Sequence, residues 1–301
     1  MKIGINSGAA SGPETTLDGL ISRAQNMEKL GFDCFWMAQM FGLDAMTALA
    51  LVAQQTSTIK LGTAVVPSHP RHPLVMAQQA VTTNAAAKGR FTLGIGLSHK
   101  PIIEGMFGLD YSKPARHMNE YLQILAPALR NEKISYSGEL YKARGQIAVA
   151  ESESVPLLVA ALGDAMLKLA GTYADGTITW MTGPKTLEQH IIPKLRKAAE
   201  AAGRPSPRIV AGIPTAIVSD KDSAIARINK GMKMYGQLDS YRAMLDREGA
   251  EGPADIAFVG DEEELRLKIQ RLRDIGVTDL NCAILGVGDH DTTAQFLASE
   301  L

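Results

Sequence analysis

Three of the six histidines stand in two short polar segments, each of which follows an apolar run. His69 and His72 flank Arg71, and His99 precedes Lys100. A cation beside an imidazole, whose ordinary pKa is about 6.5, can hold an anionic ligand and supply a proton near neutral pH. Polar residues also gather on exposed loops whatever their role, so the same pattern fits an ordinary surface. The elements that position the two segments must decide between these interpretations.

Other kinds of catalytic site find little support in the sequence. Three prolines keep segment 67–73 extended, the chain has no His-Glu-x-x-His, and its cysteines are not at ligand spacing, so we expect no metal site. Cys34 and Cys282 stand in apolar runs and are expected to be small buried side chains. No Gly-x-Ser-x-Gly sequence is present, so a nucleophilic serine is not predicted.

Short apolar runs alternate with amphipathic helical patterns along the whole chain. This alternation fits either a closed (β/α)8 TIM barrel or an open doubly wound sheet. Eight runs favour the barrel, as does Gly94-Ile95-Gly96, which lacks the third glycine of a dinucleotide-binding loop. We therefore predict one barrel domain over residues 1–301. The expected strands are Lys2–Asn6, Cys34–Met37, Ile59–Val66, Phe91–Gly96, Pro156–Ala161, Gly176–Trp180, Arg208–Val218 and Asp279–Leu285.

Helix ends and insertions can also be read from the sequence. Gly31 and Gly276 stand where a helix ends in a left-handed residue, and Asp261 stands where an N-cap is expected. Residues 131–150, between the fourth helix and the fifth strand, alternate around a glycine and predict an inserted hairpin. Residues 231–257 form a second, partly helical insertion between strands seven and eight.

The composition is that of a globular protein. The 301 residues are 46% hydrophobic and 21% charged, which is enough to build a large core. With 31 basic and 32 acidic residues, the net charge is −1, so no nucleic-acid or membrane-surface partner is expected. Two cysteines cannot form a disulfide framework, and no membrane span or signal peptide is predicted. We expect a cytoplasmic protein.

A barrel places its active site in the loops after the carboxyl ends of its strands. Apolar residues near these ends could form a platform for a flat, isoalloxazine-like ring, although each of them also fits the barrel core. These residues are Trp36, Met37, Val65, Val66, Leu97, Leu162, Trp180 and Met181.

Several motifs carry a resemblance to a known family. The segment 89–99, GRFTLGIGLSH, resembles the fourth strand of the bacterial luciferase-like flavin and deazaflavin oxidoreductases. Similar matches follow in family order over essentially the whole chain, at residues 59–65, 174–176, 259–261 and 275–279. The runs 98–108 and 114–118 resemble a coenzyme F420-dependent subgroup that is similar to methylenetetrahydromethanopterin reductase.

The resemblance implies a barrel enzyme, usually a homodimer, with coenzyme F420 in the C-terminal mouth. It implies a non-prolyl cis peptide at Ala64-Val65 against one face of the ring. The loop 160–163 would offer backbone N–H groups to the phosphate or ring edge, and Lys185 or Arg242 could add charge. On this basis the expected coenzyme-binding residues are Met37, Gln39, Ala64, Val65, Ser98, Ala160, Ala161, Leu162, Gly163 and Lys185, and the expected catalytic residue is His99.

The sequence departs from the better-known deazaflavin-dependent dehydrogenases of this family. Ala38-Gln39 stands where they tend to carry Asp-His, and His99 stands where they tend to carry Glu. Sugar or alcohol oxidation is therefore not expected, whereas His99 could protonate a small substrate that is reduced by hydride from C5 of the coenzyme. Two alternatives stay open: an FMN-dependent monooxygenase that uses reduced flavin and O2, and a barrel that binds flavin without catalysis.

Overall fold

The computed structural model describes residues 1–9, 15–150 and 152–301. Its strands are β1 (Lys2–Asn6), β2 (Cys34–Met37), β3 (Lys60–Thr63), β4 (Val66–Pro67), β5 (Phe91–Gly96), β6 (Ile134–Ser137), β7 (Lys142–Gly145), β8 (Leu157–Val159), β9 (Gly176–Trp180), β10 (Arg208–Ile217), β11 (Phe258–Gly260) and β12 (Asp279–Ile284). Its α-helices are α1 (Leu17–Lys29), α2 (Ala45–Gln54), α3 (Pro73–Ala86), α4 (Lys100–Gly105), α5 (Pro114–Ala128), α6 (Asp164–Tyr173), α7 (Pro184–Thr186), α8 (Ile192–Ala201), α9 (Lys221–Gly231), α10 (Asp239–Glu248), α11 (Pro253–Ile256), α12 (Glu262–Asp274) and α13 (His290–Ser299). A π-turn (Leu187–Ile191) joins α7 to α8, and a 3₁₀ turn (Tyr235–Gln237) precedes α10.

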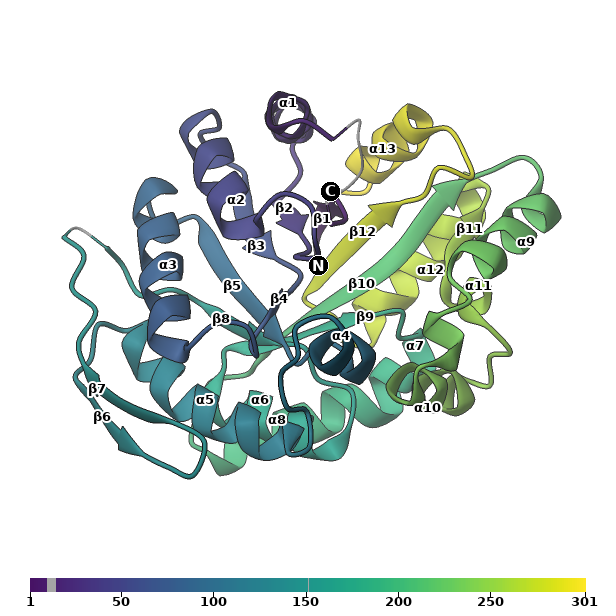
Figure 1. Cartoon of the computed structure of the whole chain (residues 1–301). Coiled ribbons are helices and arrows are strands. Elements are labelled where there is room, and N and C mark those ends of the chain that lie inside the picture. Colours follow the sequence, from purple (N-terminus) through teal and green to yellow (C-terminus); the bar gives the residue numbers. More distant parts are fainter. Residues whose placement is uncertain (10–14, 151) are drawn as a thin grey trace.

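Eight parallel strands of the described chain close into a barrel with helices around it (Figure 1). The order is β1-β2-β3-β5-β8-β9-β10-β12, and β12 pairs with β1 to complete the ring. The predicted (β/α)8 fold is confirmed. The predicted third strand, in contrast, is divided into β3 and β4 by the cis peptide bond between Ala64 and Val65.

Two packed regions lie on the two faces of the strands. The large outer cluster joins the strands to the helices, and a small cluster that includes Cys34, Trp36 and Leu158 fills the barrel interior. Glycines make room for the interior indole, because a Cβ at Gly62 would lie 2.3 Å from the ring of Trp36. The indole ring of Trp36 is thus packed directly against the backbone of Gly62, in keeping with the dense packing of barrel cores.

The helix signals predicted from the sequence are confirmed. Gly31 and Gly276 both have φ of +88°, which is the left-handed conformation expected after a helix end. The carboxylate of Asp261 caps α12 by accepting from the backbone N–H of Glu264 at 2.9 Å.

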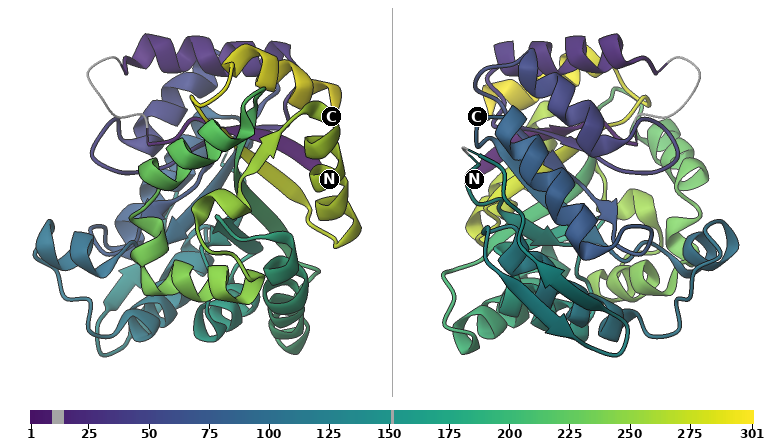
Figure 2. Two further views of the ribbon diagram at one scale, coloured as in Figure 1. Left: turned by 90° about the vertical axis from the view of Figure 1, so that its right-hand side faces the viewer. Right: turned by 60° about the vertical axis from the view of Figure 1, so that its left-hand side comes forward.

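Both insertions are present. β6 and β7 form the predicted antiparallel hairpin, and β6 packs on α5 (Figure 2). The buried carboxylate of Glu120 holds this hairpin by accepting from the backbone N–H groups of residues 139–141 at 2.9–3.1 Å. The second insertion contains α10 and α11, and it is followed by β11, a short strand that the sequence analysis did not predict and that extends the sheet beside β10.

Within the described ranges, the structure contains no helix with the length and apolar character needed to cross a membrane.

Candidate active site

The floor of the C-terminal mouth is made of small side chains. Ala64, Val65 and Ala160 are partly exposed and pack on the interior cluster. Two glycines of β5 make room for the segment between β3 and β4. A Cβ at Gly94 would lie 2.1 Å from the carbonyl oxygen of Thr63, and one at Gly96 would lie 2.9 Å from Val65. The result is an apolar and uncharged surface of small side chains.

Strand alternation decides which of the predicted contacts face this floor. On β2, Trp36 faces the interior and Met37 packs in the outer cluster, fully buried. The Met37 side chain therefore does not face the mouth, and only the backbone of this residue could make the predicted coenzyme contact. After β8, Ala160 faces the mouth, whereas Ala161 is buried in the outer cluster and offers only its backbone.

The loop after β8 leads directly into a helix. Leu162 is partly buried, and its carbonyl accepts a hydrogen bond from His190 at 2.8 Å. Gly163 is exposed and is the N-cap of α6, and no side chain within the described residues caps that helix. The first N–H groups of α6 and the positive end of its dipole are thus available to an anion.

Of the two cations predicted to add charge near the phosphate, Arg242 is engaged elsewhere through its guanidinium group, whereas Lys185 is bonded through its backbone. Lys185 is exposed at the start of α7, where Glu248 already accepts from the backbone N–H groups of residues 185 and 186 at 3.1 and 2.7 Å. Arg242 donates to Asp246 and to the carbonyls of residues 250 and 251, which closes the end of its own helix. A carboxylate therefore occupies the α7 N-terminus, where the sequence analysis placed a phosphate contact.

His99 lies at the N-cap of α4 beside the second insertion. Its ring centroid is 5.9 Å from that of Tyr241, which makes an edge contact with Tyr235, and Tyr235 in turn contacts Trp180. This aromatic row connects the loop after β5 to the end of β9 through the insertion. Burial lowers the pKa of His99 below its usual value, so the neutral imidazole predominates at pH 7.

His69 is half-buried and belongs to a stacked histidine pair rather than to an open ligand site. Its ring stacks on that of His117, with centroids 3.7 Å apart. His117 shares hydrogen bonds with the Ser68 hydroxyl at 2.8 Å and the Tyr141 hydroxyl at 3.1 Å. Burial, with a smaller contribution from the charge of His69, lowers the pKa of His117 to about 3.

The other charged residues of the two histidine segments also have structural partners. Arg71 forms an ion pair with Asp44, and Lys100 is exposed and pairs with Glu104 at 3.8 Å. His72 caps α3 by accepting from the backbone N–H of Leu74. The two segments do converge, but they carry less free positive charge than their sequence indicates.

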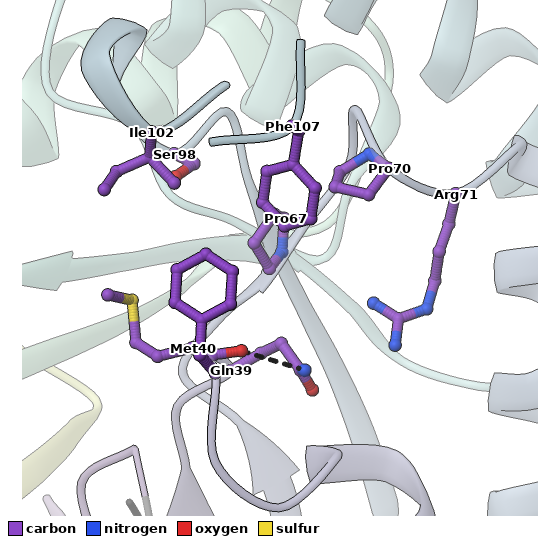
Figure 3. A pocket seen from close by; sticks show the side chains of 9 residues that line it. Gln39, Met40, Pro67, Pro70, Arg71, Ser98, Ile102 and Phe107 are labelled. Carbon is purple, nitrogen blue, oxygen red and sulfur yellow. Dashed lines mark hydrogen bonds between the residues drawn. The ribbon is translucent and has the colours of Figure 1, made fainter. Parts of the chain in front are cut away.

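A pocket of about 330 Å³ opens where the two segments meet (Figure 3). Of the predicted site residues, Gln39 and Ser98 line it. The backbone N–H of Gln39 donates to the carbonyl of Val65 at 3.1 Å, so the pocket adjoins the floor of the mouth. No group of three metal-ligating side chains was found among the described residues.

Sequence reasoning missed several residues of the mouth. His117 lies four residues before Tyr121 on the buried face of α5, and this helical spacing could have indicated it. Phe41 and Phe107 come from loops that have no periodic pattern, and Tyr241 comes from helix α10 of the second insertion. Their convergence depends on tertiary structure alone.

Comparisons with known proteins agree with this geometry. The family model described as luciferase-like monooxygenase matches residues 1–299, and the chain belongs to that family of oxidoreductase enzymes. The 5,10-methylenetetrahydromethanopterin reductase of Methanolobus tindarius is 26% identical over 289 residues, covering 85% of this chain and 87% of that protein.

Two solved structures share the fold at lower identity. An F420-dependent secondary alcohol dehydrogenase in complex with an F420-acetone adduct has a TM-score of 0.82 and 19% identity, covering 100% of this chain and 98% of the other. The oxygenating constituent of the 3,6-diketocamphane monooxygenase of Pseudomonas putida, a type II Baeyer-Villiger enzyme in complex with FMN, has a TM-score of 0.79 and 16% identity, covering 100% and 97%.

Proposed function

We propose that this chain is a coenzyme F420-dependent oxidoreductase that transfers a hydride between C5 of the deazaflavin and a small organic substrate. The floor of the mouth carries the proposal: Ala64, Val65 and Ala160 are small, apolar and partly exposed side chains, which leave room for one face of a tricyclic ring. The similarity to a methylenetetrahydromethanopterin reductase supports a deazaflavin in this place.

The protein's own contribution would be position and a proton. The small side chains of the floor admit the ring, and the exposed N-terminus of α6 at Gly163 directs backbone N–H groups toward a phosphate. Gln39 and Ser98 stand at the edge of the floor, where they can orient the ring and the substrate. The bound coenzyme supplies the hydride.

His99 is the proposed proton donor. Its half-buried ring lies at the mouth beside Tyr241, and its lowered pKa makes it a stronger acid than a free imidazole. A smaller fraction of His99 carries the proton at pH 7, but the proton is transferred more readily. The reaction is therefore expected to accelerate as the pH falls toward the pKa of this group.

An FMN-dependent monooxygenase is the second candidate, and the FMN-bound structural neighbour favours it. The same floor would accept an isoalloxazine, but the reaction would need O2 and reduced flavin. A third possibility, a barrel that binds flavin without catalysis, predicts that replacing His99 has no chemical consequence.

Titration of the purified chain with F420 and, separately, with FMN tests the proposal through fluorescence quenching. We expect micromolar or tighter binding of F420 and weaker binding of FMN. The variant Ala160→Leu should block the floor and weaken binding of F420, whereas Ala201→Leu, on the exposed end of α8, should leave it unchanged. A preference for FMN would overturn the deazaflavin assignment, and binding of neither would overturn the coenzyme site.

We also propose that the chain acts as a homodimer in the cytoplasm. The family resemblance supports the dimer, and light scattering coupled to gel filtration would measure the molar mass. A mass of one chain at micromolar concentration would contradict the dimer.

A further inference from the structure

The pocket beside the floor has one apolar wall and one polar wall. The apolar wall includes Met40, Phe41, Ile102 and Phe107, and the polar wall includes Gln39 and Arg71 (Figure 3). Its volume of about 330 Å³ is at the small end of the range for ligand sites. A deazaflavin with its phosphate and glutamyl tail is too large for this space, so the pocket is suited to the substrate beside the coenzyme.

Two aromatic rings meet at the open side of this pocket. Phe41, after β2, and Phe107, after α4, stack with centroids 5.5 Å apart and planes 28° from parallel. Both stay exposed, at 56% and 39%. Figure 2 shows that α4 and the turn after it project from the barrel, and this turn brings Phe107 to Phe41. A third ring bound here would bury apolar surface that now faces water.

The polar wall favours a ligand with a neutral hydrogen-bond acceptor over an anionic ligand. The charge of Arg71 is offset by its ion pair with Asp44, which Gln79 also contacts at 3.1 Å. The Gln39 side-chain oxygen accepts from the backbone N–H of Ala45 at 2.7 Å, which turns its amide nitrogen toward the pocket side. That nitrogen makes a contact of only 3.4 Å with its neighbour's carbonyl, so it can donate to a ligand.

We propose that the substrate is a small aromatic compound with a neutral carbonyl group, its ring packed on Phe41 and Phe107 and its carbonyl oxygen accepting from Gln39 or Arg71. This inference rests on the proposed function for the chemical step. For an aryl enone, hydride from the reduced deazaflavin would form a C–H bond at the β-carbon while the C=C π bond breaks. A proton, from His99 or water, would then add at the α-carbon, and the coenzyme would leave oxidised.

Two ketones with the same enone group isolate the contribution of the ring. 4-Phenyl-3-buten-2-one carries a phenyl group where 3-penten-2-one carries a methyl group. Titration calorimetry with the purified chain, both alone and with F420, would give the dissociation constant of each. We expect the aryl ketone to bind at least about tenfold more tightly. An aromatic contact together with the apolar area that it buries changes a dissociation constant by about this factor.

Variants then assign this preference to the two phenylalanines. Phe107→Ala and Phe41→Ala should each reduce the preference by about fivefold to tenfold. Met106→Ala is the matched control, because Met106 directly precedes Phe107 and is 60% exposed but is not among the residues that line the pocket. Phe107→Leu keeps apolar bulk without the ring and serves if the alanine variant does not fold.

Equal binding of the two ketones, or a preference that Phe107→Ala leaves intact, would overturn the inference. The coenzyme is measured separately, so the two proposals fail in different ways. Loss of F420 binding with an intact, phenylalanine-dependent aryl preference would overturn the proposed function while confirming the pocket. Normal F420 binding without the aryl preference would support the proposed function and overturn the substrate inference.

Discussion

The imidazole rings of His69 and His117 lie 5° from parallel at 3.7 Å, so that each ring forms part of the apolar surroundings of the other. Two protonated rings at this distance would repel each other strongly. The neutral pair is instead fixed by Ser68 and Tyr141, which hold the two nitrogens of His117. The pair thereby joins the loop after β4 to helix α5 and the hairpin.

The pair predicts a loss of stability in mild acid. The folded pKa of His117 is about 3, below its unfolded value, so the unfolded chain takes up the proton first as the pH falls. The contribution of neutral His117 to the free energy of unfolding is fully present above about pH 6.5. It is lost as the pH falls toward about 3, at up to about 1.4 kcal/mol per pH unit. His117→Gln should be less stable at pH 7 but should show a shallower decline between pH 6.5 and 4.5. Urea denaturation at several pH values measures both slopes, and identical slopes would contradict the assignment.

A second prediction concerns His99. Replacing the proposed acid by alanine should lower turnover by about 10²-fold to 10⁴-fold, because the proton transfer loses its donor. In the unmodified protein, turnover should rise from pH 8 toward an apparent pKa below 6.5, since burial lowers the pKa of this imidazole. Lys100→Ala, at the next and exposed position, is the control. A pH profile that His99→Ala does not alter would remove His99 from the chemistry.

Gly94 should not tolerate a side chain. A Cβ there would lie 2.1 Å from the carbonyl oxygen of Thr63, and the Thr63 hydroxyl and the Gly94 backbone exchange two hydrogen bonds of 2.8 Å. We expect Gly94→Ala to cost about 1–3 kcal/mol or more, the usual range for overpacking. Gly105→Ala, with open space around the glycine, should be neutral or slightly stabilising. Thermal unfolding of the two variants compares them directly, and equal melting temperatures would refute the close contact.

Glu248 gives a fourth prediction, for the second insertion. Its carboxylate caps α7 through the N–H groups of residues 185 and 186, so Glu248→Ala should cost about 0.5–2 kcal/mol. Because α10 carries Tyr241 to His99, the same change should increase hydrogen exchange in segment 235–248. Glu251→Ala is a suitable control, since only backbone groups of that exposed residue form the hydrogen bonds seen here. An unchanged exchange pattern in Glu248→Ala would show that the cap does not hold the insertion.

Much of the fold followed from periodicity and capping. Seven of the eight barrel strands lie where apolar runs predict them, because strands buried on both faces have a simple pattern. The third was predicted as one strand, since Ile59–Val66 is continuously β-prone and nothing in those residues shows where pairing stops. β11 was missed because three residues give no period to detect.

The candidate site was predicted less completely. Position along the strands placed His99, Ser98 and Ala160 at the mouth. Whether a side chain faces the floor or the outer core depends on strand register, which the sequence does not show, and the Met37 side chain lies in the outer core. Lys185 was chosen for its charge, and no local signal shows that Glu248, 63 residues later, binds the same turn. Contacts between distant segments of this kind are decided by the packing of the whole barrel.

The pairing of β1 with β12 has a consequence for how the chain acquires its structure. Lys2 aligns with Asp279, so β1, which is synthesised before the other strands of the barrel, pairs on one side with β12, which is synthesised after them. Until residue 284 has been synthesised, β1 and β10 both present unpaired backbone edges, which are templates for association with other chains. Closure also brings together contacts of very high sequence separation, a feature of slow folding. Chains truncated before β12 should therefore depend on chaperones and aggregate at concentrations at which a chain that includes β12 stays dispersed.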